Sequence, residues 1–218
     1  AHYPSDFDVL EFRDNGIGLC TGRFGLSISS GLWLDVVGCM DIVLGRFTTE
    51  LTASQGIQAK IGTMDRLTSP VIALILDRLN QYLSLRAVQM IQSSQAALLT
   101  VIGILGQPKV LADGVIWHFP HLENILIDVE HPPFLELGEV FRERRQAAAT
   151  SGYPCAIKEL HISPLHSRLE QVANNQVDRK TAVELDKLQD ALGGGRLYWR
   201  SRLWKTCLDK RVPESAVS

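Results

Sequence analysis

Alternation of apolar and polar residues near both ends of the chain predicts strands. In residues 7–13, Phe7, Val9 and Leu10 together with Phe12 can bury one face of a strand. In residues 196–203, apolar side chains alternate with arginines, which predicts a strand with one basic face. Three further strands are expected at residues 41–44, 46–51 and 155–162.

Apolar residues that recur every three or four positions predict helices in most of the remaining chain. The two main stripes cover residues 61–79 and 88–105, with a short connection at residues 83–86. Pro70 lies inside the first stripe and is expected to kink that helix. Two such helices form either a hairpin that dimerises as a four-helix bundle or a core pair within one domain. Other helices are expected at residues 26–37, 122–129, 137–150 and 168–192.

The composition is typical of a globular protein without an extreme charge. The chain has 218 residues, of which 45% are hydrophobic and 21% charged, and its formal net charge is -2. A chain of this length can bury a core as one large domain or two small ones. With no basic surplus, neither nucleic acid nor a membrane surface is an expected partner. The basic run Arg142, Glu143, Arg144 and Arg145 is therefore expected to be a solvated helix face.

The cysteines do not indicate a metal site or a disulfide framework. Cys20, Cys39, Cys155 and Cys207 lie far apart, and no Cys-x-x-Cys pair is present. A reducing compartment, and hence a cytoplasmic location, is the expectation. The apolar runs at residues 71–76 and 96–105 are too short or too interrupted to cross a bilayer.

Candidate chemistry is concentrated where the first predicted strand ends. Asp14 is followed by Gly16 and Gly18, which let the backbone turn tightly and approach a ligand closely. The Asp14 carboxylate could accept a hydrogen bond from an exocyclic amine such as that of adenine. Because Asn15-Gly16 is also a common tight-turn dipeptide, an ordinary hairpin is the alternative.

Together with segments elsewhere in the chain, this acidic glycine turn resembles the core of sensor histidine kinases. That core consists of a dimerisation hairpin followed by an ATPase domain. The similar segments are residues 9–18 (first glycine motif), 25–29 (end of the second), 32–51 (last helix and strands of the ATPase domain), 58–60 with 67–71 and 91–105 (hairpin), and 168–175 (asparagine helix).

The resemblance implies an α+β sandwich with a mixed sheet covered on one face by helices, plus a two-helix dimerisation hairpin. The segments come in a circularly permuted order, which is tolerated when the termini lie close together. Residues 1–53 would form the C-terminal half of the ATPase-like domain, residues 54–115 the hairpin, and residues 116–218 the N-terminal half. The strand at residues 196–203 would then pair beside residues 7–12.

The resemblance also implies cofactors and partners. The cofactors would be ATP and Mg²⁺. Asp14 would hold the adenine, and Asn175 would lie near the phosphates. Gly16, Gly18 and Gly25 would allow the backbone to approach the nucleotide. A homodimer through the hairpin and a response-regulator receiver domain would be the partners.

Several departures from the family pattern argue against efficient phosphoryl transfer. Asp65 stands where the phosphate-accepting histidine is expected, and Arg179 where an asparagine would bind Mg²⁺. Arg23 and Phe24 replace small residues of the second glycine motif. No catalytic or metal-binding residue is therefore assigned. The alternatives are a nucleotide-free dimeric scaffold or phosphotransfer partner, or a sequence that fills this fold without a selected activity.

The histidines give no stronger signal. His118, His121 and His131 lie near prolines at irregular spacing and are expected to be loop residues rather than metal ligands. His161 and His166 are expected at the surface.

Overall fold

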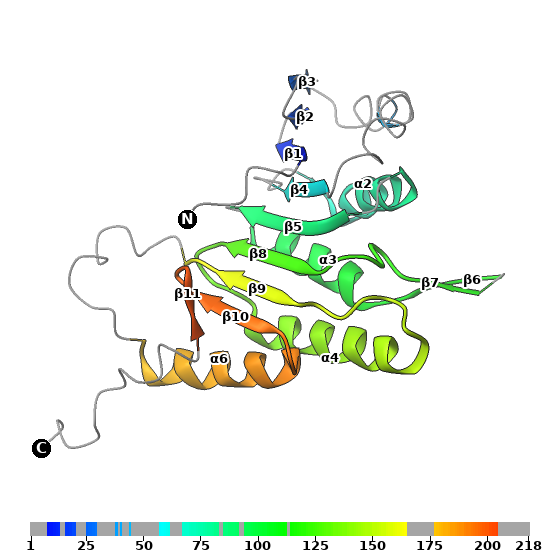
Figure 1. Ribbon diagram of the computed structural model, residues 1–218. Coiled ribbons are helices and arrows are strands. Elements are labelled where there is room, and N and C mark those ends of the chain that lie inside the picture. The colour runs from blue at the N-terminus through cyan, green and yellow to red at the C-terminus, as the bar shows by residue number, and fades with distance from the viewer. Residues whose placement is uncertain are drawn as a thin grey trace, which may run out of the picture.

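The structure is a computed structural model that describes residues 8–13, 16–20, 25–29, 38, 40, 44, 57–61, 67–82, 85–91, 94–112, 114–164 and 177–204. The elements are β1 (Asp8–Arg13), β2 (Gly16–Cys20), β3 (Gly25–Ser29), β4 (Ile57–Ile61), α2 (Ser69–Tyr82), β5 (Leu85–Ile91), α3 (Gln95–Gly106), β6 (Lys109–Leu111), β7 (Gly114–Ile116), β8 (Asn124–Asp128), α4 (Phe134–Ser151), β9 (Glu159–Ile162), α6 (Arg179–Leu192), β10 (Arg196–Trp199) and β11 (Arg202–Leu203) (Figure 1).

One mixed sheet organises the described part of the chain. Its nine strands run in the order β11-β10-β9-β8-β5-β4-β1-β2-β3, and β6 and β7 form a separate hairpin. Neighbouring strands from β1 through β4, β5, β8 and β9 to β10 pair in parallel, whereas β2, β3 and β11 pair antiparallel at the two ends. The expected α+β class is therefore confirmed.

The helices cover one face of this sheet because the parallel strands advance in a single direction. Each connection from β4 to β5, β8, β9 and β10 moves one strand along the sheet. Connections of one hand that all move the same way place their helices on the same side. In agreement, α2 packs on α3, α3 on α4, and α4 on α6. In Figure 1, α4 and α6 lie on the same side of strands β9 and β10.

The core lies between the sheet and these helices. Alternate residues of each central strand point into it, as period-two alternation requires. The helices contribute apolar positions at spacings of three and four residues. Buried core residues from the strands are Val88, Met90, Ile125, Ile127, Leu160, Ile162, Leu197 and Trp199, and those from the helices include Ile72, Ile75, Leu79, Leu98, Val101, Ile102, Leu137, Phe141, Leu185 and Leu188.

Local signals set several helix boundaries. The Ser94 side chain accepts a hydrogen bond from the amide of Ala97 (3.3 Å) at the start of α3, and Asp178 accepts one from Thr181 (2.9 Å) at the start of α6. Gly152, with φ of 70°, follows α4 in the left-handed conformation. Pro70 is in the first turn of α2, where the missing amide donor is not needed, so the expected kink is corrected to a helix start.

The expected two-helix hairpin at residues 54–115 is corrected by the strand between its helices. α2 and α3 do pack together, but β5 separates them in sequence and β4 precedes them, so both are crossovers of the sheet. The single sheet takes strands from the expected hairpin segment as well as from the two expected halves of the ATPase-like domain. It draws β1–β3 from residues 1–53, β4 and β5 from residues 54–115, and β8–β11 from residues 116–218.

Other sequence expectations are also corrected. Residues 26–29 and 124–128, expected in helices, lie in strands β3 and β8. Residues 196–203 form two strands around Arg200 and Ser201, which have positive φ angles of 50° and 65°. This segment does not pair beside β1, since β9, β8, β5 and β4 lie between β10 and β1.

Arg144 of α4 is fully buried, with 0% of its surface exposed, which corrects its expected place on a solvated face. Its guanidinium donates hydrogen bonds to the carbonyl oxygens of Leu105 (3.1 Å), His118 (3.1 Å) and Phe119 (2.8 Å). It thereby ties the end of α3 and the turn before β8 to α4.

Candidate functional site

The glycines of the predicted ATP site are in paired strands. Gly16 and Gly18 belong to β2, opposite Arg13 and Glu11 of β1, and Gly25 begins β3. The described backbone here is an antiparallel pair of strands, β1 and β2. Asp14 and Asn175 lie outside the described residues, so the joint ATP site stays a prediction.

The strand order has a reversal beside β1. In open α/β sheets, ligands bind where the strand order reverses direction. β2 and β3 follow β1 on one side, whereas β4 and the later parallel strands lie on its other side. From β4 to β10 the order advances in one direction, and a second candidate surface is the sheet face opposite the four described helices.

On that face, polar and aromatic side chains of neighbouring strands lie next to each other. We define the open face as Gln89, Asp128, Glu159, His161, Arg196 and Tyr198, which come from β5, β8, β9 and β10. The register places Tyr198 opposite His161 and Arg196 opposite Glu159. These positions alternate with the core residues of the same strands, so their side chains point away from the helices.

The side chains of the open face hold one another in place. The rings of His161 and Tyr198 stack with centroids 4.2 Å apart and an interplanar angle of 5°. Glu159 forms an ion pair with Arg196, and its Oε2 lies 3.2 Å from Nε2 of His161. The side chains of Glu159 and His161 are 24% and 29% exposed. Such fixed, half-buried groups lose little conformational entropy when a partner binds.

A second pair of polar residues extends the open face toward the middle of the sheet. Nε2 of Gln89 donates a hydrogen bond to Oδ2 of Asp128 at 2.6 Å. Gln89 is buried, and so are Ala87 and Leu126 on the same face, so the accessible part of the open face lies over β9 and β10. The open face therefore offers carboxylate acceptors, a guanidinium donor and an aromatic surface, which suits recognition of polar and aromatic groups.

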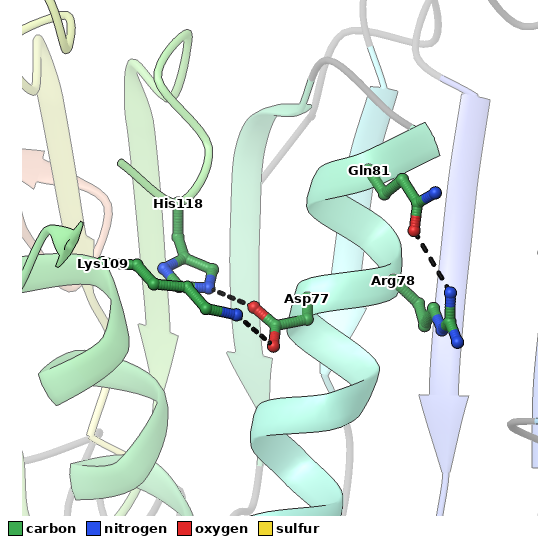
Figure 2. A network of polar contacts seen from close by, with 5 residues as sticks. All are labelled: Asp77, Arg78, Gln81, Lys109 and His118. Atoms are coloured by element: carbon green, nitrogen blue, oxygen red, sulfur yellow. Dashed lines mark hydrogen bonds and ion pairs between the residues drawn. The ribbon is translucent and has the colours of Figure 1, made fainter. Parts of the chain in front are cut away.

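The Asp77 network is a separate cluster on the helix side, shown in Figure 2. Asp77 of α2 accepts a hydrogen bond from Nζ of Lys109 (3.0 Å), and its Oδ1 lies 2.7 Å from Nε2 of His118. One turn later, Oδ1 of Asn80 accepts a hydrogen bond from the amide of Phe119 (2.6 Å). Phe119 has a positive φ of 47°, so these bonds hold a sparsely populated backbone conformation.

The electrostatics of Asp77 favour its charged form. Burial by itself would raise the pKa of this carboxyl, but hydrogen bonds and charge from His118 and Lys109 outweigh burial. The pKa of Asp77 is therefore lowered below its ordinary value of 3.8. The network acts as a tether between α2 and the turn at residues 117–119.

Replacing Asp77 with asparagine is expected to lower the free energy of unfolding by about 1 kcal/mol at pH 7, because it weakens the contacts with Lys109 and His118. The effect is no larger because ion pairs of partly exposed groups contribute less than those of buried groups. A carboxyl with a lowered pKa stabilises the fold above its unfolded pKa and loses that contribution as the pH falls through the folded value. The difference between Asp77→Asn and the unsubstituted chain should therefore begin to shrink near the ordinary pKa of 3.8 and vanish only below the lowered pKa of the folded state, as measured by urea unfolding at several pH values.

A matched control for this prediction is Glu139→Gln, which removes a carboxylate with no ion pair to another described residue. Equal effects of the two substitutions at pH 7 would show that the Asp77 network does not stabilise the turn.

In the ranges that the structure describes, no group of three or more histidine, cysteine or carboxylate side chains could hold a metal ion. Among the described helices, none combines the length and apolar character needed to span a bilayer.

Sequence reasoning missed the site as a combination of residues. It placed His161 at the surface and noted the alternation in residues 196–203, but it did not join the two strands. The available signal was the same two-residue period in both segments, with polar residues at alternate positions. Asp77 had no distinguishing local pattern, since its partners lie 32 and 41 residues away.

No protein-family model, curated protein or solved structure matches this chain.

Proposed function

We propose that this chain is a binding scaffold whose open face recognises a protein partner. The observation that carries the proposal is the winding of the sheet. Strands β4, β5, β8, β9 and β10 start at residues 57, 85, 124, 159 and 196, and each is laid beside the previous one in the same direction. A helix layer on one side leaves the opposite sheet face available as an extended surface, much as the concave surface of a solenoid is available for binding.

The chemistry of the open face supports this role. Parallel sheets usually have both faces covered, and their strands are then apolar on both faces. In β9 and β10 the residues that point away from the helices are instead Glu159, His161, Arg196 and Tyr198. A stacked aromatic pair beside an ion pair offers both contact area and specific hydrogen bonding to a protein partner.

The histidine-kinase-like reading remains a prediction from the sequence. ATP and Mg²⁺ binding, a receiver-domain partner and a homodimer through residues 54–115 all follow from that resemblance. The feature of the described geometry that supports a ligand site there is the reversal of strand order beside β1, whereas the open face gives the scaffold proposal a defined set of side chains.

The direct test places a photo-crosslinking amino acid at Tyr198, with a second variant carrying it at Val183. Val183 lies on α6, on the helix side, and is exposed. In cells of the source organism, discrete protein adducts are expected from position 198, and these should be lost when His161 is replaced with alanine. Position 183 should not give the same adducts.

Identical adducts from both positions, or adducts unaffected by His161→Ala, would contradict recognition through the open face. Isothermal titration with ATP and Mg²⁺ tests the competing prediction. Saturable heat at micromolar to millimolar ATP would favour the kinase-like reading over a nucleotide-free scaffold.

A further inference from the structure

A groove of about 780 Å³ lies between α3 and α4. Its floor includes Leu99, Ile102 and Val140, and its rim includes Glu139 and Glu143. The groove is formed by the helix layer and is separate from the open face of the sheet.

The floor of the groove is apolar because α3 is apolar almost all round. The sequence of α3, QAALLTVIGILG, contains no charged residue. One side of the helix is buried in the core, but Leu99 on another side is only half-buried and Gly103 is exposed. A helix that is apolar all round is normally covered on every side. The groove side of α3 therefore lacks the cover that its composition predicts.

One wall of the groove is acidic. Glu136, Glu139 and Glu143 recur on α4 at spacings of three and four residues and all line the groove. None of these three forms an ion pair with another described residue. Arg142 also lines the groove, so the four charged lining residues leave a net negative wall.

Two glycines of α3 give the groove its shape. A Cβ at Gly106 would lie 2.5 Å from Cγ2 of Val140, so this glycine lets α3 and α4 approach closely. A Cβ at Gly103, by contrast, would meet no atom within 4 Å. Packing inside the protein thus does not require glycine at position 103, and glycine is unfavourable within a helix. Its effect is to keep the groove floor free of a side chain.

We propose that this groove binds an amphipathic helix of a partner protein, with leucine-like residues on one face and lysine or arginine beside them. The apolar floor would take the apolar face, as in other helix-in-groove complexes. The acidic wall would pair with the flanking basic residues, which also disfavours acidic partners. α3 has 12 residues and rises about 1.5 Å per residue, so a ligand helix of about three turns would fill the groove.

The test uses the full chain and a fluorescein-labelled 14-residue peptide with leucines at helical spacing and lysines elsewhere. A second peptide carries glutamate in place of every lysine. Fluorescence anisotropy is expected to show binding of the basic peptide at least tenfold tighter than that of the acidic one. Gly103→Trp, which fills the groove, should weaken binding of the basic peptide at least tenfold. Gly194→Trp is the matched control, since a Cβ there also meets nothing within 4 Å.

A second variant keeps the proposal testable if Gly103→Trp folds poorly. The double substitution Glu139→Lys and Glu143→Lys changes two exposed positions and should reverse the preference between the peptides. Equal affinity for both peptides, no binding, or normal binding by Gly103→Trp would overturn the proposal. A homodimer lost in Gly103→Trp during sedimentation would also overturn it, in favour of a second copy. None of these results depends on crosslinking at Tyr198, so the two proposals can fail separately.

Discussion

Replacing Arg144 with leucine is expected to lower the free energy of unfolding by about 2–4 kcal/mol. The side chain is fully buried and donates to three carbonyl oxygens. The carbonyl of Phe119 also accepts a bond from the amide of Leu122, but those of Leu105 and His118 would lose a donor inside the protein. Each buried polar group left without a partner costs about 1–3 kcal/mol.

The loss is partly offset because leucine removes a buried charge. Burial lowers the pKa of Arg144 to about 10, so at neutral pH the guanidinium is still charged and carries a desolvation cost. The face of Trp117, with its ring centroid 5.9 Å from Cζ of Arg144, compensates part of that cost. The expected net loss in the free energy of unfolding is therefore smaller than the sum of the maximum costs of the two carbonyl groups left without a partner.

Urea unfolding at pH 7 measures this effect, with Arg142→Leu as the control. Arg142 is an exposed arginine two positions earlier on α4, and its substitution should change the free energy of unfolding by less than about 0.5 kcal/mol. Arg144→Lys keeps the charge but cannot reach three carbonyl groups with the geometry of a guanidinium, so it should also be strongly destabilising. If Arg144→Leu were as stable as Arg142→Leu, the clamp between α3, α4 and the turn would contribute nothing.

The position of Arg144 shows how helix periodicity can outweigh composition. A run of four charged residues at 142–145 suggested a solvated face. The structure buries Arg144 with Leu137, Val140 and Phe141, which precede it by seven, four and three residues. That spacing is the sequence signal for one buried helix face. What the sequence could not supply is the set of carbonyl groups that Arg144 meets, because they come from residues 105, 118 and 119.

The strands were predictable where one face is polar and unpredictable where both faces are buried. Residues 159–162 and 196–199 alternate, and both are strands. β8 has three consecutive buried residues, Ile125, Leu126 and Ile127, and β5 has four, so neither shows a two-residue period. Buried parallel strands read as continuous apolar runs that periodicity cannot separate from helix.

The open face depends on strand order, which no local pattern encodes. The stacked rings of His161 and Tyr198 are 37 residues apart in sequence and meet through the parallel pairing of β9 with β10. The sequence supported α+β class and one-sided helix cover. It did not reveal that successive strands are laid down in one direction, which is what leaves this face opposite the helices.

The second large effect is expected at Gly106, where α3 lies directly against Val140 of α4. Gly106→Ala should lower the free energy of unfolding by about 1–3 kcal/mol, because inserting a methyl group into a tight contact forces a backbone shift or an unfavourable rotamer. The new Cβ would lie 2.5 Å from Cγ2, 3.3 Å from Cβ and 3.4 Å from Cα of Val140. A rotation of the Val140 side chain would relieve the contact with Cγ2 but would not change the short distances to Cβ and Cα of Val140.

Gly103→Ala in the same helix is the matched control and should have the opposite sign. Its Cβ would meet nothing within 4 Å, so alanine should stabilise the chain by about 0.5–1 kcal/mol through helix propensity alone.

Removing the clash from the other side tests the cause of the first effect. In a Val140→Ala background, Gly106→Ala should cost close to nothing, which a double-mutant cycle in urea would measure as a coupling of at least about 1 kcal/mol. A cost that is the same in both backgrounds would locate the strain elsewhere than in the contact between α3 and α4. Destabilisation by Gly103→Ala would show that position 103 is packed, and would also remove the open floor on which the peptide groove depends.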